Sequence, residues 1–430
     1  MPGLNNRQTD AVFRKIAWRI MPFLMVCYLL ALVDRTNIGF AKLSFMSDLG
    51  FSEVAYGFGA GIFYLGYLLL EVPSNLLLDR VGLRLTLMRI MVLWGICTFA
   101  MAFMWSPASF ATLRFLLGAA EAGFFPGLIL YLTYWITARR RAWFTALLMS
   151  CPAIAGMAGS LMAGVVMTAT DGMLGLRGWQ WLFVVEGAPT IVLGVVAFFY
   201  LADKPAEARW LSAAERQVVL DELAAEARAK RGVTHESLLD ALRDARFLLL
   251  LPACFALYAS TSTNAFWAAS ILRDAGATQA GRAAYLLFVP NAVGLFVQLA
   301  VARSSDRRGE RRWHAAACLL AAATGWLLLP WVPGSVELSL FALVLAIGGT
   351  IAAFAPFFSL APGYLSAGAA PAGIAIVTTL GSLAGFVMPL VIGRVTAATG
   401  SLVFAQVGIG TLLAGGAILL VVNRPPAAAR

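Results

Sequence analysis

The sequence predicts an all-α membrane protein in which twelve transmembrane helices form two pseudo-symmetric six-helix bundles. Of its 430 residues, 60% are hydrophobic and only 13% are charged, whereas a soluble domain is about half apolar and about a quarter charged. The apolar runs are long and continuous, as in a helix of about 20 residues that crosses a bilayer. They lack the alternating pattern of a barrel strand. A pattern repeated in the two halves, described below, supplies the two-bundle arrangement.

Twelve apolar segments have the length that a helix needs to cross the hydrocarbon core of a bilayer. The expected spans are 16–38, 54–78, 86–105, 108–136, 142–168, 179–201, 247–272, 282–303, 314–332, 338–362, 371–396 and 402–422.

One long polar stretch separates the first six spans from the last six. We therefore expect an N-terminal bundle over 1–202, a linker over 203–246 and a C-terminal bundle over 247–430. Within the linker, Ser212 and Glu215 have the spacing of a capping box, and good helix formers follow them. The linker is thus expected to contain an amphipathic helix.

The two halves share a short loop pattern, Asp-Arg-x-Gly. It follows the second and eighth spans, at Asp79, Arg80 and Gly82 and again at Asp306, Arg307 and Gly309. The two copies are about 230 residues apart, and a constant offset of this size indicates duplicated halves, as in many transporters.

The loops predict the orientation of the chain. Most of the 32 lysines and arginines lie in one alternating set of loops, and the opposite set holds only Lys42, Arg177, Arg273 and Arg282. Because Lys and Arg concentrate in cytoplasmic loops, both termini are predicted to be cytoplasmic.

A few ionisable residues interrupt the apolar spans, and each costs of order 2.5–3.5 kcal/mol on insertion scales. Asp34 and Arg35 are adjacent in the first span. Arg114 and Glu121 are seven residues apart in the fourth span, which places them on one helix face, two turns apart. They could form ion pairs that only hold the first span to the fourth. Alternatively, the acids carry protons while an arginine binds an anion, which suits a planar guanidinium fork.

The second interpretation is favoured, because keeping a buried ion pair rarely adds stability over apolar packing. Two further acids, Glu71 and Glu186, also lie in the apolar spans. Glu71, at the end of the second span, is expected to make a structural or gating contact, and the role of Glu186 in the sixth span stays open. Around Glu121, Pro126 frees a backbone carbonyl and permits a kink, while nearby glycines allow close helix packing.

Several classes of protein are excluded. No metalloprotease, hydrolase, P-loop or dinucleotide motif is present, so a membrane enzyme is not expected. The five cysteines and two histidines have no metal-ligand spacing, and no metal or cofactor is predicted. The net charge of +10 comes from short loops between spans, which is a topology signal and not a nucleic-acid surface.

Six strings carry a family resemblance that covers nearly the whole chain. They are LVDRTNIGFA at 32–41, GYLLLEVPSNLLLDRVG at 66–82, LRFLLGAAEAGFFPGLILYLTYW at 113–135, GWQWLFVVEGAP at 178–189, SDRRGERRWH at 305–314 and GIAIVTTLGSLAGFVMP at 373–389. Taken together, they resemble the major facilitator superfamily. Within it, the chain is similar to the anion:cation symporter family of bacterial organic-acid permeases, which includes tartrate, hexuronate, galactonate and phthalate transporters.

The resemblance implies a multi-pass protein of the bacterial inner membrane, functional as a monomer, whose two bundles rock about a central site. Acids matching Asp34 and Glu121 are implied to carry protons, so that the proton gradient drives transport without a cofactor. Arginines matching Arg35 and Arg114 would serve substrate binding and coupling, and Tyr67 would line the site. The Asp-Arg-x-Gly loops match the conformational loop motif of the superfamily.

Departures from the family pattern bear on the substrate. Sugar-acid members often have Tyr at Leu32, Trp at Phe358 and Asn at the positions of Thr378 and Ser382. Phe358, Thr378 and Ser382 are therefore candidate substrate contacts that offer fewer hydrogen bonds, and such a site is poorly suited to a polyhydroxylated acid. Asn264 is a fourth candidate, because it lies about 230 residues after Asp34, which is the offset between the two repeated halves. We expect a less hydroxylated carboxylate, aromatic or a short diacid.

The predicted function is import of an organic carboxylate anion (a sugar acid, dicarboxylate or aromatic acid) together with protons, by alternating access. A proton-driven exporter of metabolites or drugs is the alternative. It is less favoured because residues 152–164 contain glycines but not the antiporter string common in exporters. A membrane receptor that binds a carboxylate without moving it is a third possibility.

Overall fold

The computed structural model describes residues 6–229, 245–360 and 370–423. In this part of the chain, twelve helices are long and apolar enough to cross a membrane, which confirms the predicted number of spans. Exposed tryptophans lie near both ends of the helices, Trp18 and Trp313 at one end and Trp105 and Trp331 at the other. Tryptophan is enriched at both membrane–water interfaces, so these positions agree with a spanning bundle.

In the described part of the first half and the linker, the chain forms eight α-helices, with two short 3₁₀ turns between them. The long helices are α1 (Asn6–Leu49), α2 (Glu53–Val81), α3 (Leu83–Met101), α4 (Pro107–Glu121), α5 (Phe124–Trp135), α6 (Ala138–Ala169), α7 (Gly178–Tyr200) and the linker helix α8 (Ala213–Ala229). The 3₁₀ turns are η1 (Met173–Gly175) and η2 (Pro205–Glu207).

The second half has the same plan. Its helices are α10 (Ala245–Leu248), α11 (Leu251–Asp274), α12 (Ala280–Leu286), α13 (Phe288–Arg308), α14 (Arg312–Leu328), α15 (Val336–Leu360), α16 (Ala370–Thr399) and α17 (Val403–Val422), with the 3₁₀ turn η3 (Leu329–Trp331).

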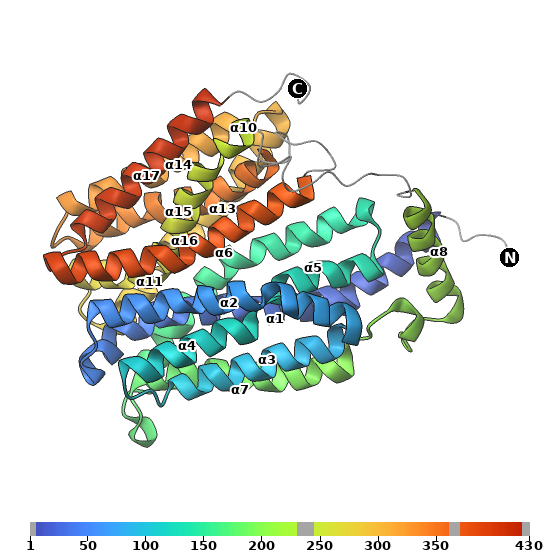
Figure 1. Ribbon diagram of the computed structural model, residues 1–430, viewed down its shortest axis with the longest axis horizontal. Helices are drawn as coiled ribbons and strands as arrows, with labels where there is room; N and C mark the ends of the chain where they lie inside the picture. Colours follow the sequence, from blue (N-terminus) through green and yellow to red (C-terminus); the bar gives the residue numbers. More distant parts are fainter. Residues whose placement is uncertain (1–5, 230–244, 361–369, 424–430) are drawn as a thin grey trace.

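The two halves form two helical groups that meet along α2 and α16, α1 and α11, and α6 with α12 and α13. We call the side on which the start of α1, α8 and the end of α17 lie the termini side, and the opposite side the far side. In Figure 1 the two groups lie together at the far side and diverge towards the termini side.

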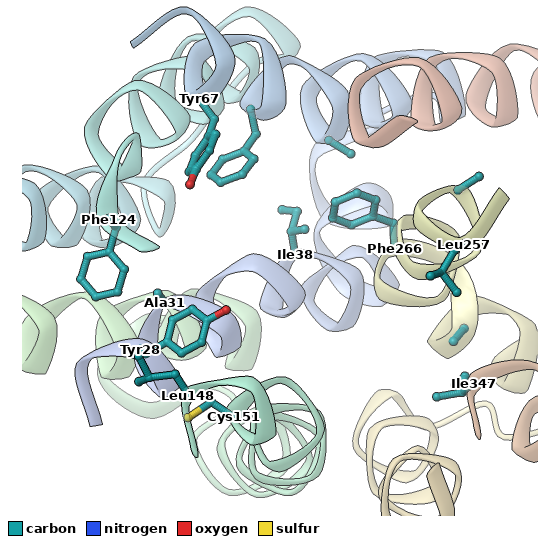
Figure 2. Packing of buried hydrophobic residues seen from close by; sticks show 14 of the residues in the cluster. Tyr28, Ala31, Ile38, Tyr67, Phe124, Leu148, Cys151, Leu257, Phe266 and Ile347 are labelled. Atoms are coloured by element: carbon teal, nitrogen blue, oxygen red, sulfur yellow. The ribbon is translucent and has the colours of Figure 1, made fainter. Parts of the chain in front are cut away.

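Close backbone packing joins the two groups at the far side. Gly39 lies against the backbone of Ala265, and Gly57 lies against the backbone of Pro389, with no room for a side chain at either glycine. Figure 2 shows Ile38 of α1 beside Phe266 of α11 at this junction. Small residues allow helices to approach closely in a membrane, so these positions set the contact between the halves.

The first span is longer than predicted, and Lys42 was wrongly placed in a loop. α1 continues to Leu49, and Lys42 is 2% exposed inside it. Its Nζ lies 2.8 Å from Oε2 of Glu53 and over the rings of Tyr56 and Trp267, at 4.4 and 5.0 Å. These contacts compensate the charge, so a lysine is tolerated within the helix. They also join α1 and α2 to α11 at the far side.

The fourth span is broken where a kink was expected at Pro126. α4 ends at Glu121 and α5 begins at Phe124, and Gly123 between them has φ 81°. This left-handed conformation is accessible to glycine without steric cost. Pro126 lies in the first turn of α5, where a backbone N–H has no intrahelical partner to lose. The break follows Glu121 directly.

The linker helix begins at the predicted capping box. The backbone N–H of Ser212 donates to Glu215 Oε2, and the N–H of Glu215 donates to Ser212 Oγ. Glu215 also pairs with Lys15 of α1 at 2.8 Å. The hydrogen bond from Lys15 lowers the pKa of Glu215 below its ordinary value. The linker helix is therefore attached to the first helix of the chain.

Replacing Gly123 with alanine should destabilise the protein. Alanine at this position would have to adopt the left-handed backbone conformation, which costs about 1–2 kcal/mol. Its Cβ would also lie 2.8 Å from Cβ of Ser74. The measurement is the thermal unfolding midpoint of the purified protein in detergent. Gly408→Ala in α17 is the control, since nothing lies within 4 Å of a Cβ there. If the unfolding midpoint of Gly123→Ala equals that of the control, the left-handed break between α4 and α5 at Gly123 is contradicted.

Candidate functional site

One ion pair joins the first span to the fourth. Arg35 of α1 directs both Nε and Nη2 at Oε1 of Glu121, each at 2.7 Å. Glu121 is fully buried at the end of α4, and the Arg35 side chain is 26% exposed. The guanidinium also lies over the rings of Tyr67 and Phe63, at 5.0 and 5.7 Å. Arg35 is thus held by one carboxylate oxygen and two aromatic rings.

Arg114 is buried without such a partner. It is 1% exposed, its Nε donates to the backbone oxygen of Gly59 at 3.3 Å, and its guanidinium lies 4.6 Å from the centre of the Phe63 ring. Among the described residues, neither Nη1 nor Nη2 has a hydrogen-bond partner. A buried charged donor without an acceptor is expensive, so Arg114 has the character of an anion-binding group.

Asp34 lies near Arg114 and forms no ion pair with it. Asp34 is 2% exposed, and its Oδ1 accepts a hydrogen bond from Thr98 of α3 at 2.7 Å. Its Oδ2 has no hydrogen-bond partner in the described part of the chain. The sequence allowed two ion pairs between these four charged residues, and the structure forms only the one between Arg35 and Glu121.

Glu186 of α7 belongs to the same cluster, although the sequence analysis assigned no role to this residue. It is 3% exposed, and Asn37 of α1 donates hydrogen bonds to both Glu186 and Asp34. The available signal was Asn37, which stands three residues after Asp34 and therefore on the same helix face. Spacing along one helix could not show which residue of another helix it meets.

Tyrosines surround the charged residues. Tyr67 is 8% and Tyr28 is 7% exposed, and Figure 2 shows their hydroxyl groups on the sides of α2 and α1 that face each other. Tyr28 also stacks on Phe125 with ring centres 5.1 Å apart. Glu71, one turn after Tyr67, is half-buried and within electrostatic range of Arg35.

The candidate residues of the second half are less tightly grouped. Asn264 is half-buried, and its Oδ1 has no hydrogen-bond partner among the described residues. Phe358 stacks on Phe354, with ring centres 6.0 Å apart, and Phe354 meets the edge of Tyr258. On α16, Ser382 is half-buried and Thr378 is exposed. The second half therefore offers aromatic surface with a few polar groups.

The loop motifs lie at the termini side. Gly82 packs against the carboxylate of Asp203, whose Oδ1 accepts from the backbone N–H of Arg84. In the second copy, Gly309 ends α13 and Asp306 lies 4.0 Å from Arg311. Arg80 and Arg307 are exposed, and the side chain of Asp79 lies outside the described part of the structure.

Comparison with known proteins identifies the class. Residues 24–389 match the model of the Major Facilitator Superfamily, and the fold matches a D-xylose-proton symporter with a TM-score of 0.75 at 14% identity, over 96% of this chain and 99% of that one. The chain therefore belongs to the major facilitator superfamily. It is a secondary transporter and not an enzyme.

Relatives narrow the class. The chain is 43% identical over 421 residues to the "Putative tartrate transporter" of Agrobacterium vitis, covering 97% of this chain and 96% of that one. It is 37% identical over 391 residues to the "Inner membrane transport protein RhmT" of Escherichia coli (strain K12), covering 91% and 89%. It is 36% identical over 395 residues to the "Quinolone resistance transporter" of Acinetobacter baumannii, covering 91% and 90%. These matches confirm the resemblance to permeases of the anion:cation symporter type.

Removing one partner of the Arg35–Glu121 pair should destabilise the protein more than removing both. Arg35→Met leaves Glu121 buried and unpaired, a change that costs about 3–5 kcal/mol in other proteins. The double variant Arg35→Met with Glu121→Met removes the unpaired charge and should recover most of the thermal stability. Unfolding midpoints in detergent measure both. If the double variant is no more stable than Arg35→Met, the pair is not coupled as the geometry indicates.

Proposed function

We propose that this protein is a proton-coupled symporter that imports a short dicarboxylate across the bacterial inner membrane. The observation that carries the proposal is Arg114, a buried guanidinium whose two terminal nitrogens have no partner among the described residues. A planar fork of this kind suits a carboxylate. The relative named for tartrate supports a short diacid as the substrate class.

The charges support an orientation with both termini in the cytoplasm. Basic loops lie on the termini side, where Arg80 and Arg307 are exposed, and the positive-inside rule favours the cytoplasm for this side. One relative is named as an inner membrane protein. With the far side facing the periplasm, the backbone contacts around Gly39 and Gly57 close the periplasmic side. The two bundles, 1–202 and 247–430, would rock as units, and the chain would act as a monomer in the bilayer.

Coupling follows from competition for Arg35. In the structure one oxygen of Glu121 receives both Nε and Nη2 of Arg35. A proton on Glu121 removes its charge and weakens this pair, because hydrogen bonds to an ionised acceptor are the stronger ones. Arg35 can then turn to a second carboxylate of the substrate while Arg114 holds the first. Protonation thus prepares the site for a dianion, and ionisation of Glu121 displaces the dianion.

Asp34 lies beside Arg114 and controls the charge that the substrate meets there. While Asp34 is ionised, its negative charge offsets part of the attraction between Arg114 and the substrate anion. Protonation of Asp34 removes this negative charge and strengthens the attraction. Asp34 and Glu121 are therefore the proposed proton-coupling residues, each beside one arginine. Tyr67, which lies over Arg35, restricts where that guanidinium can move.

The second bundle would complete the site. Asn264 and Ser382 supply polar contacts, and the stacked rings of Phe358 and Phe354 present an apolar wall. Thr378 is the most exposed of the four candidates on this side. A site with few hydrogen-bonding groups discriminates poorly in favour of a polyhydroxylated acid, which agrees with a short diacid.

A proton-driven exporter is the second candidate. The relative named for quinolone resistance favours it, as does the aromatic wall of the second bundle. The same buried acids would then take protons from the periplasm in exchange for substrate. The direction of proton-driven flux in membrane vesicles of known orientation separates the two candidates, and a receptor would give binding without flux.

The test of the proposed function is uptake by reconstituted vesicles under an inward proton gradient. Radiolabelled tartrate and succinate should accumulate, and unlabelled hexonates should compete weakly. Arg114→Lys should raise the apparent KM about tenfold, because a charge-assisted hydrogen bond contributes about 1.5–3 kcal/mol. Arg394→Lys on the exposed face of α16 is the control and should behave as wild type.

Two results would contradict the proposal. An unchanged apparent KM in Arg114→Lys removes Arg114 from the binding site. Strong and selective uptake of hexonates would rule out a short diacid as the substrate class.

A further inference from the structure

Two buried carboxyl groups share one hydrogen-bond donor in the first bundle. Asn37 lies one turn after Asp34 in α1 and is 2% exposed. Its Nδ2 donates to Asp34 Oδ1 at 3.5 Å and also to Oε2 of Glu186 on α7. One NH₂ group, which has two hydrogens, therefore bridges an acid of the first span and an acid of the sixth.

The second oxygen of each acid has no partner. Asp34 Oδ2 and Glu186 Oε1 are both buried and without a hydrogen bond in the described part of the chain. An ionised carboxylate can accept several hydrogen bonds. Leaving a buried, charged acceptor without a hydrogen bond costs free energy. An unpartnered oxygen costs less when it belongs to a neutral carboxylic acid. The hydrogen bonding therefore favours one protonated and one ionised group.

The charges around the pair point the same way. From α4, Arg114 acts on Asp34 at a distance, and Arg35 of α1 acts more weakly because Glu121 holds it. The groups facing the pair from α3 are Thr98, Cys97 and Trp94, which bring no positive charge. The charge that acts on Glu186 is that of Asp34. No ion pair among the described residues includes Asp34 or Glu186.

Counting charges gives the number of protons. The buried cluster has three acids, Asp34, Glu121 and Glu186, against two arginines, Arg35 and Arg114. With every group ionised, one negative charge is left over. Like charges in a shared site cannot both ionise at low cost, and the uncompensated one lies where the two bridged acids meet. A single proton on the pair neutralises the cluster.

We propose that Asp34 and Glu186, which Asn37 bridges by donating to both, form a carboxyl pair that holds one exchangeable proton between them, so that Glu186 is a further proton-coupling residue. This inference rests in part on the proposed function, because coupling presupposes proton-driven transport. The shared proton itself does not depend on transport. The proton belongs to the pair and not to either residue alone.

The pair connects proton occupancy to the substrate. An anion bound at Arg114 takes up the positive field that helps Asp34 to ionise, and the pair then holds its shared proton up to a higher pH. When the anion leaves, Arg114 again favours the ionised form, and the shared proton is released more readily. In this scheme Glu186 sets the pH range over which Asp34 is protonated, without contacting the substrate.

The direct test is infrared spectroscopy of the purified protein in detergent at neutral pH, with no substrate added. The wild type should show the C=O stretch of a buried protonated carboxylic acid, shifted by deuterium exchange. Asp34→Asn and Glu186→Gln should each lose this band, because one remaining acid no longer has a like charge to relieve. Glu186→Asp, which keeps an acid, should retain it. The exposed Glu207→Gln is the control and should also retain it.

A band that persists in both Asp34→Asn and Glu186→Gln would overturn the proposal, because the proton would then be held elsewhere. A band that is absent from the wild type would overturn it as well. Both outcomes can be read without any transported substrate, so they are distinguishable from a failure of the proposed function.

The pH profile of uptake is the second measurement. In the wild type, protonating the pair relieves repulsion between two acids, so it occurs at a higher pH than protonation of Asp34 alone. Glu186→Gln removes the repulsion and should shift the pH of half-maximal uptake to more acidic values by about one unit or more. Uptake at the acidic plateau should recover. A uniform loss at every pH, with no shift, would indicate a structural role and contradict the proposal.

Discussion

The arrangement of the first bundle depends on the burial of charge between α1 and α4. Arg35 and Glu121 meet at 2.7 Å in a bundle whose interior is mostly apolar, and a membrane interior tolerates such groups only when they are paired or functional. The pairing is unequal, because Arg35 is neutralised by Glu121 whereas the terminal nitrogens of Arg114 are unpartnered among the described residues. In the proposed function, this inequality would give the site one available guanidinium, that of Arg114, and one, that of Arg35, which protonation of Glu121 would release.

The two bundles contribute different chemistry to the proposed site. The first holds the buried acids and arginines, while the second presents stacked aromatic rings and isolated polar groups such as Asn264. Contact between the bundles is made at the far side, through backbone packing at Gly39 and Gly57 and through the hydrogen bond from Tyr56 to Phe266. Lys42 lies in the same region, enclosed by Glu53, Tyr56 and Trp267. An alternating-access transporter has to open these contacts to expose the site to the other side.

Much of this could be predicted from the sequence, and the reasons for the failures are physical. Twelve spans follow from the length and hydropathy of the runs, and the shared face of Arg114 and Glu121 follows from helical periodicity. Lys42 was misplaced because its compensation comes from three residues outside its own span. Glu186 had no assigned role because its partner lies on another helix. The break after Glu121 depends on the backbone conformation of Gly123, whereas Pro126, the more visible signal in the sequence, lies in the first turn of the helix that follows the break.

The central claim is that the substrate anion and the ionised carboxylate of Glu121 pair with the same arginine, Arg35, in alternation. It is tested most directly by measuring proton uptake when tartrate binds to the purified protein in weakly buffered detergent solution near neutral pH. Proton uptake that accompanies binding, and that is reduced in Glu121→Gln, is the result that the account predicts. Saturable tartrate binding with no change in proton occupancy would contradict it.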